Sequence, residues 1–149
     1  MNYAEILTIL APCGLNCRKC MANAEGEIKL HSKCLLELLG PSFERYAQRF
    51  KSFMPVFEKY PEAKNLLEFF STADCRGCRS GMCRYPSCGV MKCHKEKGVD
   101  FCFQCNDFPC DGSGLDPDLR KRWIQMNERM KEIGVESYYD ETKDLCRYS

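Results

Sequence analysis

Apolar side chains between residues 27 and 50 recur at helical spacings and predict two successive helices. The first expected helix spans Glu27–Leu39 and ends at Gly40-Pro41, because this pair does not continue a helix. The second begins after Ser42, whose hydroxyl can cap the N-terminus of a helix. Its apolar side follows the spacing i, i+3, i+4 and i+7 and consists of Phe43, Tyr46, Ala47 and Phe50.

Two prolines mark the boundaries of the next expected helix. Pro55 is expected to end or kink the second helix, because proline lacks the N–H donor and clashes with the preceding turn. Pro61 fits the first turn of a third helix that runs toward Asp74. The buried side of this helix is expected to consist of Leu66, Leu67, Phe69 and Phe70.

The C-terminal helix has the clearest boundaries in the sequence. Asp116-Pro117 is a capping residue followed by a proline at the first helical position, and Gly134 supplies the stop. The apolar positions between them recur at spacings of four, three, four and three, which predicts a helix facing the core: Leu119, Trp123, Met126, Met130 and Ile133. Beyond it, Tyr138, Tyr139 and Tyr148 suggest a tail that packs back.

A different pattern governs residues 75–110. Cysteines recur there every five residues, at Cys78, Cys83, Cys88 and Cys93, a period that matches neither helix nor strand and predicts an irregular segment. The segment holds few apolar side chains, so it needs covalent or metal links to become ordered. The expected fold is therefore mainly α, a single cysteine-rich metal-binding domain over residues 1–149, with four to five helices and an irregular lobe stapled by zinc.

The amino-acid composition helps to decide whether disulfides or metal ions order the cysteine-rich segment. The 149 residues include thirteen cysteines, and 22 Lys and Arg stand against 21 Asp and Glu, a net charge of +1. No apolar run approaches the length of about 20 residues that spans a membrane, and residues 1–5 lack the basic start of a secretory signal. A cytoplasmic location is expected. In a reducing cytoplasm, clustered thiols bind metals more often than they form disulfides.

Three C-x-x-C pairs identify the candidate ligands: Cys17 with Cys20, Cys75 with Cys78, and Cys102 with Cys105. This spacing lets one tight turn present two sulfurs to one ion, and Gly77 suits such a turn because it tolerates a positive φ. About two Zn²⁺ ions are expected. One partition places Cys75, Cys78, Cys88 and Cys93 around one ion and draws the second set from Cys13, Cys17, Cys20, Cys102, Cys105 and Cys110.

The remaining cysteines and the histidines are weaker candidates. Cys83 is a lesser candidate ligand, and Cys146 ligates only if the tail folds back. Cys34 lies on an apolar helix face, where a free buried thiol is expected. His94 is expected to be solvated, although ligation by its ring is left open.

The cysteine motifs resemble those of a prokaryotic family known as domain of unknown function 3795. The resemblance rests on residues 11–20 (APCGLNCRKC), 75–79 (CRGCR), 96–102 (EKGVDFC) and 105–110 (CNDFPC), and it extends to residues 133–135. It implies zinc binding and no established activity. Matched to the motif, the implied ligands are Cys13, Cys17, Cys20, Cys75, Cys78, Cys88, Cys93, Cys102, Cys105 and Cys110.

The sequence indicates the function of the protein less directly than it indicates metal binding. Common enzyme motifs such as H-E-x-x-H and G-x-S-x-G are missing, and a closed Cys₄ site leaves no open position for substrate, so a non-catalytic binding or scaffold module is expected. One alternative is an iron–sulfur or thiol-based redox protein, because clusters also use four cysteines. The sequence leaves a protein partner open.

A second alternative is a zinc knuckle that binds nucleic acid. Residues 75–97 carry a net charge of +5, and Tyr85 offers a surface for base stacking. However, residues 99–119 carry −5. Mutual neutralisation of the two segments is the favoured interpretation, which argues against nucleic acid as a partner.

Overall fold

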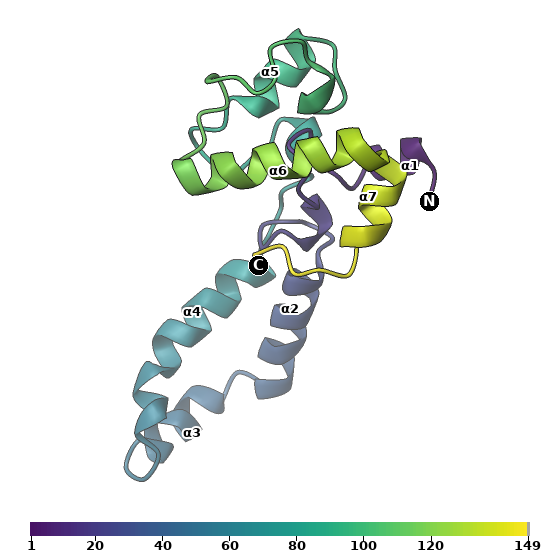
Figure 1. The fold of residues 1–149 in the computed structure, drawn as a ribbon. Coiled ribbons are helices and arrows are strands. Elements are labelled where there is room, and N and C mark those ends of the chain that lie inside the picture. The colour runs from purple at the N-terminus through teal and green to yellow at the C-terminus, as the bar shows by residue number, and fades with distance from the viewer. Residues whose placement is uncertain (149) are drawn as a thin grey trace. The chain divides into compact units, whose positions relative to one another are not determined.

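The computed structural model describes residues 1–148, and this part of the chain is mainly helical. It contains seven α-helices, four short 3₁₀ helices and no β-sheet (Figure 1). The mainly α class is confirmed, but four to five helices was too few. The additional α-helices include α1 (Tyr3–Leu7) and α5 (Val90–Glu96), which are too short to show a periodic apolar pattern in the sequence.

The chain divides into two compact units. The cysteine unit comprises Met1–Cys20 and Cys75–Ser149, and the helical unit comprises Met21–Asp74. Twelve of the thirteen cysteines belong to the cysteine unit, and only Cys34 lies in the helical unit. A single domain over residues 1–149 stays a prediction. No helix among residues 1–148 combines the length and apolar character needed to cross a bilayer.

The helical unit has the predicted boundaries except at Pro55. α2 spans Glu27–Leu39, α3 spans Phe43–Phe50, and α4 spans Tyr60–Ser71 with its proline in the first turn. The prediction that Pro55 ends or kinks the second helix was wrong, because α3 already ends at Phe50. Pro55 instead opens the 3₁₀ helix η2 (Pro55–Lys59), which joins α3 to α4. Ser42 was wrongly expected to cap α3 with its side chain, because its hydroxyl accepts a hydrogen bond from the Arg45 guanidinium instead.

The packing of the helical unit differs from the prediction. α2 packs against α4, but no residue of α4 is buried, and Leu66 and Phe69 are 54% and 58% exposed. Cys34 is also exposed rather than buried. Three helices and one 3₁₀ turn offer too few neighbours to cover both sides of α4. Aromatic side chains pack α3 against η2, where the ring centroids of Phe50 and Phe57 are 5.1 Å apart.

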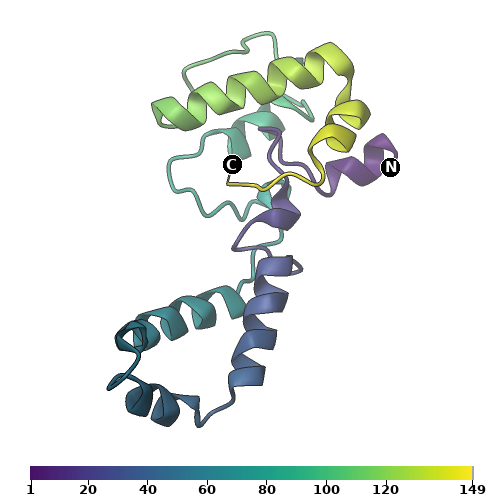
Figure 2. The ribbon, with the colours of Figure 1, turned by 60° about the horizontal axis from the view of Figure 1, so that its bottom comes forward.

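The core of the cysteine unit forms where the two ends of the chain meet. Ile6 and Leu10 from the N-terminal segment pack with Phe101, Met130, Val135 and Tyr138. α6 (Pro117–Ile133) has the predicted bounds, with the Asp116 carboxylate accepting two backbone N–H bonds at its start. At Gly134 the chain turns back into α7 (Val135–Thr142), visible in both views (Figure 1 and Figure 2). The prediction that the tail packs back holds for Tyr138, which is buried, and for Tyr139, which packs against the same core, whereas Tyr148 is 62% exposed.

Candidate metal centre

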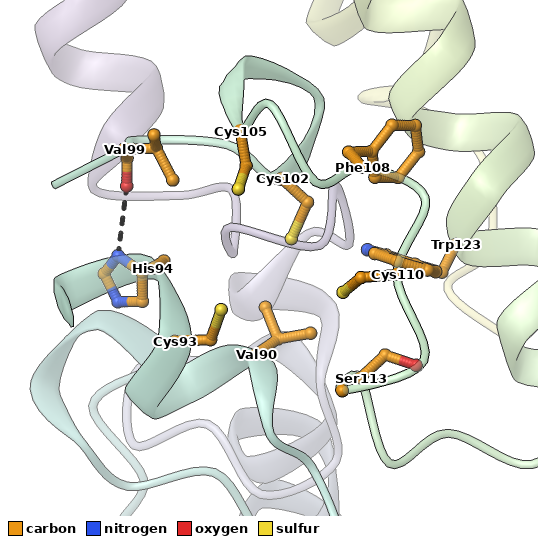
Figure 3. A pocket seen from close by; sticks show the side chains of 11 residues that line it. Val90, Cys93, His94, Val99, Cys102, Cys105, Phe108, Cys110, Ser113 and Trp123 are labelled. Atoms are coloured by element: carbon orange, nitrogen blue, oxygen red, sulfur yellow. Dashed lines mark hydrogen bonds between the residues drawn. The ribbon is translucent and has the colours of Figure 1, made fainter. Parts of the chain in front are cut away.

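Four cysteines line one small pocket in the cysteine unit. Cys93 lies on α5, Cys102 begins the 3₁₀ helix η4 (Cys102–Gln104), and Cys105 and Cys110 follow in the next loop. The pocket encloses about 30 Å³. Figure 3 shows the four sulfur atoms pointing toward one another from α5 and from the loop opposite. We call this the four-cysteine pocket.

The other walls of the pocket are mostly apolar. Val90, Val99, Phe108 and Trp123 line it, and the rings of Phe108 and Trp123 meet edge to face at 4.9 Å. Burial, together with the neighbouring Cys13, Cys93 and Cys110, raises the pKa of Cys102 to about 12. Burial also raises the pKa of Cys93. Several thiolates in such a pocket therefore require a compensating positive charge.

Two unpaired polar atoms lie on residues that line the same pocket. Among residues 1–148, the buried side-chain nitrogen and oxygen atoms without a hydrogen-bond partner are Nε2 of His94 and Nε1 of Trp123. The indole N–H of Trp123 is close to Cys102, where it favours the thiolate and so lowers the pKa. A buried N–H without a partner is costly, so the Trp123 indole indicates that this wall of the pocket faces electron-rich sulfur. Nε2 of the neutral His94 ring is an acceptor instead, because Nδ1 faces the Val99 carbonyl.

The environment of His94 differs from the sequence expectation. Its ring was expected to be solvated, but it is 8% exposed. Nδ1 lies 3.3 Å from the carbonyl oxygen of Val99, and burial lowers the pKa of the ring. The reason is local structure, since α5 turns His94 inward, whereas an irregular segment was predicted here. That prediction was wrong for residues 90–96.

A second group of sulfurs forms a chain of contacts. Cys17, at the start of η1 (Cys17–Lys19), lies near Cys78, at the start of η3 (Cys78–Ser80), and electrostatic interactions continue from Cys78 to Cys83 and from Cys83 to Cys88. The Cys78 thiol favours the Cys17 thiolate and so lowers the pKa of Cys17. Interactions of the same kind lower the pKa of Cys83 and raise those of Cys78 and Cys88. We call these four residues the thiol chain.

Three further cysteines surround the thiol chain. Burial raises the pKa of Cys13 to about 11, and its nearest charged neighbours include Cys17 and Cys83. Cys75 lies near Cys20 and Cys17, and its thiol donates to the Met82 carbonyl at 2.8 Å. The C-x-x-C turn around Gly77 is confirmed. Gly77 has φ +95°, and its N–H donates to Cys75 Sγ at 3.4 Å.

The structure groups the cysteines differently from the expected partition. Cys93 was expected beside Cys75, Cys78 and Cys88, but it lines the four-cysteine pocket instead. Cys83, a lesser candidate, is central to the thiol chain. One sequence signal was available, because the pocket takes the four cysteines that follow one another from residue 93 to residue 110. The C-x-x-C spacing alone does not indicate this order.

The buried side chain of Asn127 holds these segments in place. It is 0% exposed. Its Oδ1 accepts the Phe103 N–H at 3.0 Å, and its Nδ2 donates to the Cys13 carbonyl at 3.0 Å and to the Trp123 carbonyl at 2.9 Å. One amide on α6 therefore fixes the Cys13 loop, which borders the thiol chain, and η4, which borders the pocket.

All thirteen cysteines are free thiols. In residues 1–148 no set of three or more His, Cys, Asp or Glu side chains is arranged to hold a metal ion as it stands. The metal-ligand role of the ten named cysteines therefore stays a prediction.

A comparison with family models identifies the chain. The model described as "Protein of unknown function (DUF3795)" matches residues 9–114 of the 149, more than half of the sequence. The chain belongs to the DUF3795 family. The resemblance expected from the motifs is thus confirmed. The DUF3795 match contains the four cysteines of the pocket and the thiol chain, but it ends before Trp123, residues 133–135 and Cys146. Comparisons with curated proteins and with solved structures find no match.

Proposed function

We propose that this DUF3795 protein is a non-catalytic binding or scaffold module whose cysteine unit is held together by structural zinc. One observation carries the proposal. Four sulfurs from separate positions between residues 93 and 110 line a single small pocket (Figure 3). The proposal extends beyond the family match, because the family description names no function.

The donor set fits Zn²⁺. Structural zinc sites take four ligands, and Cys₄ is a common set. Cys93, Cys102, Cys105 and Cys110 would hold the ion, and its positive charge would favour the thiolates that burial alone disfavours. The Trp123 N–H would then lie beside a negative sulfur. Bound zinc would link α5 to the loop opposite and supply folding free energy, about 10–16 kcal/mol in small zinc domains.

The thiol chain is the proposed source of the second site. Together with Cys13, Cys20 and Cys75 it gathers seven cysteines, more than one zinc ion needs. Four of the seven would hold the second ion. Two sites filled by cysteine alone have no open position for a water or substrate, so a binding or scaffold role follows better than catalysis.

Metal analysis of anaerobically purified full-length protein tests the proposal. We expect a colourless protein with about two zinc ions per chain. Cys105→Ser should lose about one equivalent by removing a pocket ligand, and Cys78→Ser should lose about one by removing a member of the thiol chain. Cys34→Ser is the matched control, because Cys34 lies in the helical unit, and it should retain both ions.

Cys146→Ser should also retain both ions. Loss of one equivalent in this variant would show that the C-terminal segment supplies a ligand. A brown protein containing iron and acid-labile sulfide would overturn the zinc proposal and favour the electron-transfer alternative. Absence of any bound metal would overturn both.

A further inference from the structure

The cysteine unit contains a second, more open cavity with a different chemistry. It measures about 250 Å³ and lies between residues 14–19, α6, α7 and the segment that follows α7. Its lining contains no Asp or Glu. It includes four basic side chains, Lys19, Arg122, Arg129 and Arg147. A cleft lined by one sign of charge concentrates ions of the opposite sign.

Three of the four cations are anchored by backbone carbonyls. Lys19 Nζ donates to Leu145 O at 2.8 Å, and the Arg122 guanidinium donates to Arg147 O at 2.7 Å. Arg147 donates in turn to Asn16 O at 2.6 Å. A carbonyl orients a cation without cancelling its charge. An ammonium has three N–H donors and a guanidinium has five, so each cation retains donors beyond this bond.

The charges in the cavity are only partly offset. Arg129 pairs with Glu132 and Glu141, so it contributes little net charge. Arg147 lies near Cys20, Cys17 and Cys13, whose thiolates would offset part of its charge. In the described chain, Lys19 and Arg122 form no ion pair with a carboxylate. A net positive charge therefore remains at Lys19 and Arg122.

We infer that this cavity binds a small phosphorylated molecule through Lys19, Arg122 and Arg147. A phosphate group offers several acceptor oxygens and up to two negative charges, and guanidinium groups match it with paired N–H donors. The cavity is below the usual size range of pockets for drug-sized ligands. This favours a compact ligand, with the phosphate as its main point of recognition. The inference is independent of the zinc proposal.

Titration calorimetry with inorganic pyrophosphate tests the inference on the full-length protein as purified. We expect saturable binding at one site. Lys19→Gln and Arg122→Gln should each weaken it about tenfold, the effect of losing one charge-assisted hydrogen bond. Gln125→Glu adds a negative charge at the cavity without removing a bond to the tail, and it should also weaken binding.

Lys121→Gln is the matched control. It changes the net charge by the same amount and neighbours Arg122 on α6, but Lys121 does not line the cavity. Its affinity for pyrophosphate should equal that of the wild type. No saturable binding, or equal weakening in Lys121→Gln, would overturn the inference. Tighter binding of a tricarboxylate or of a single-stranded oligonucleotide than of pyrophosphate would overturn the assignment to a small phosphorylated ligand.

Discussion

The buried amide of Asn127 joins α6 to the Cys13 loop and to η4 through hydrogen bonds. Replacing Asn127 with Leu keeps the branched shape and the number of side-chain heavy atoms but leaves the Phe103 N–H and the Cys13 carbonyl without their partners. We expect a loss of about 3 kcal/mol in the free energy of unfolding. Urea denaturation of the full-length protein as purified measures it. Glu128→Ala, at an exposed position of the same helix, should change stability by less than about 0.5 kcal/mol. Equal losses would contradict the assigned role of Asn127.

Two glycines with nearly the same positive φ allow the cost of backbone strain to be measured apart from the cost of a steric clash. Gly114 and Gly98 have φ +64° and +63°. A Cβ at Gly114 would collide with the Ser87 carbonyl, whereas a Cβ at Gly98 would meet nothing within 4 Å. Gly98→Ala should therefore cost about 1 kcal/mol from backbone strain alone.

Gly114→Ala should cost about 3 kcal/mol or more, because the substitution also separates residues 87–89 from residues 112–114, which the Gly89 N–H to Ser113 carbonyl bond joins. Thermal denaturation of the two variants side by side gives the difference. Similar melting temperatures would contradict this prediction, because they would show that residues 112–114 can move to relieve the clash at little cost in stability.

At the scale of elements, the helices are better predicted at their ends than on their faces. Gly40-Pro41, Asp116-Pro117 and Gly134 set boundaries through local backbone chemistry, and α2 and α6 have the predicted bounds. The face of α4 was predicted from apolar content alone, yet Leu66 and Phe69 are exposed. Which face is buried depends on neighbouring elements that the local pattern does not contain.

The position of α6 beside the four-cysteine pocket gives a direct readout of metal removal. Trp123 is the only tryptophan, it is 2% exposed, and it lines the pocket. If the pocket holds zinc, a chelator should loosen the loop and shift the Trp123 fluorescence emission to longer wavelength. The emission of Cys105→Ser should be shifted already and should respond less to the chelator. An unchanged wild-type spectrum after complete loss of metal would contradict zinc binding at this pocket.

At the scale of the whole molecule, the charge pattern disfavours nucleic acid as a partner. The Lys97 ammonium pairs with Asp107 at 2.7 Å, and the Tyr85 hydroxyl donates to Asp116 at 3.1 Å. Both contacts join the basic segment, residues 75–97, to the acidic segment, residues 99–119. The aromatic ring proposed for base stacking is thus tied to an acidic side chain.

We therefore expect weak binding of single-stranded RNA or DNA at physiological salt. Changing Arg84, Lys92 and Lys95 to Glu should lower stability more than it changes this binding. A fluorescence titration across salt concentrations measures the affinity. Tight binding with a steep salt dependence that the triple variant abolishes would favour the zinc-knuckle alternative.

The sequence by itself determined the mainly α class, the ends of its long helices, the C-x-x-C turn at Gly77 and the family. Each of these depends on residues close together in the chain, where capping, proline and glycine conformation act directly. Only the tertiary structure decided the grouping of Cys93 with Cys102, Cys105 and Cys110, the burial of His94 and the role of Asn127. The physical reason is that α5 and the contacts between residues 87–89 and 112–114 set which sulfurs meet, and sequence spacing does not encode the path of the chain between them.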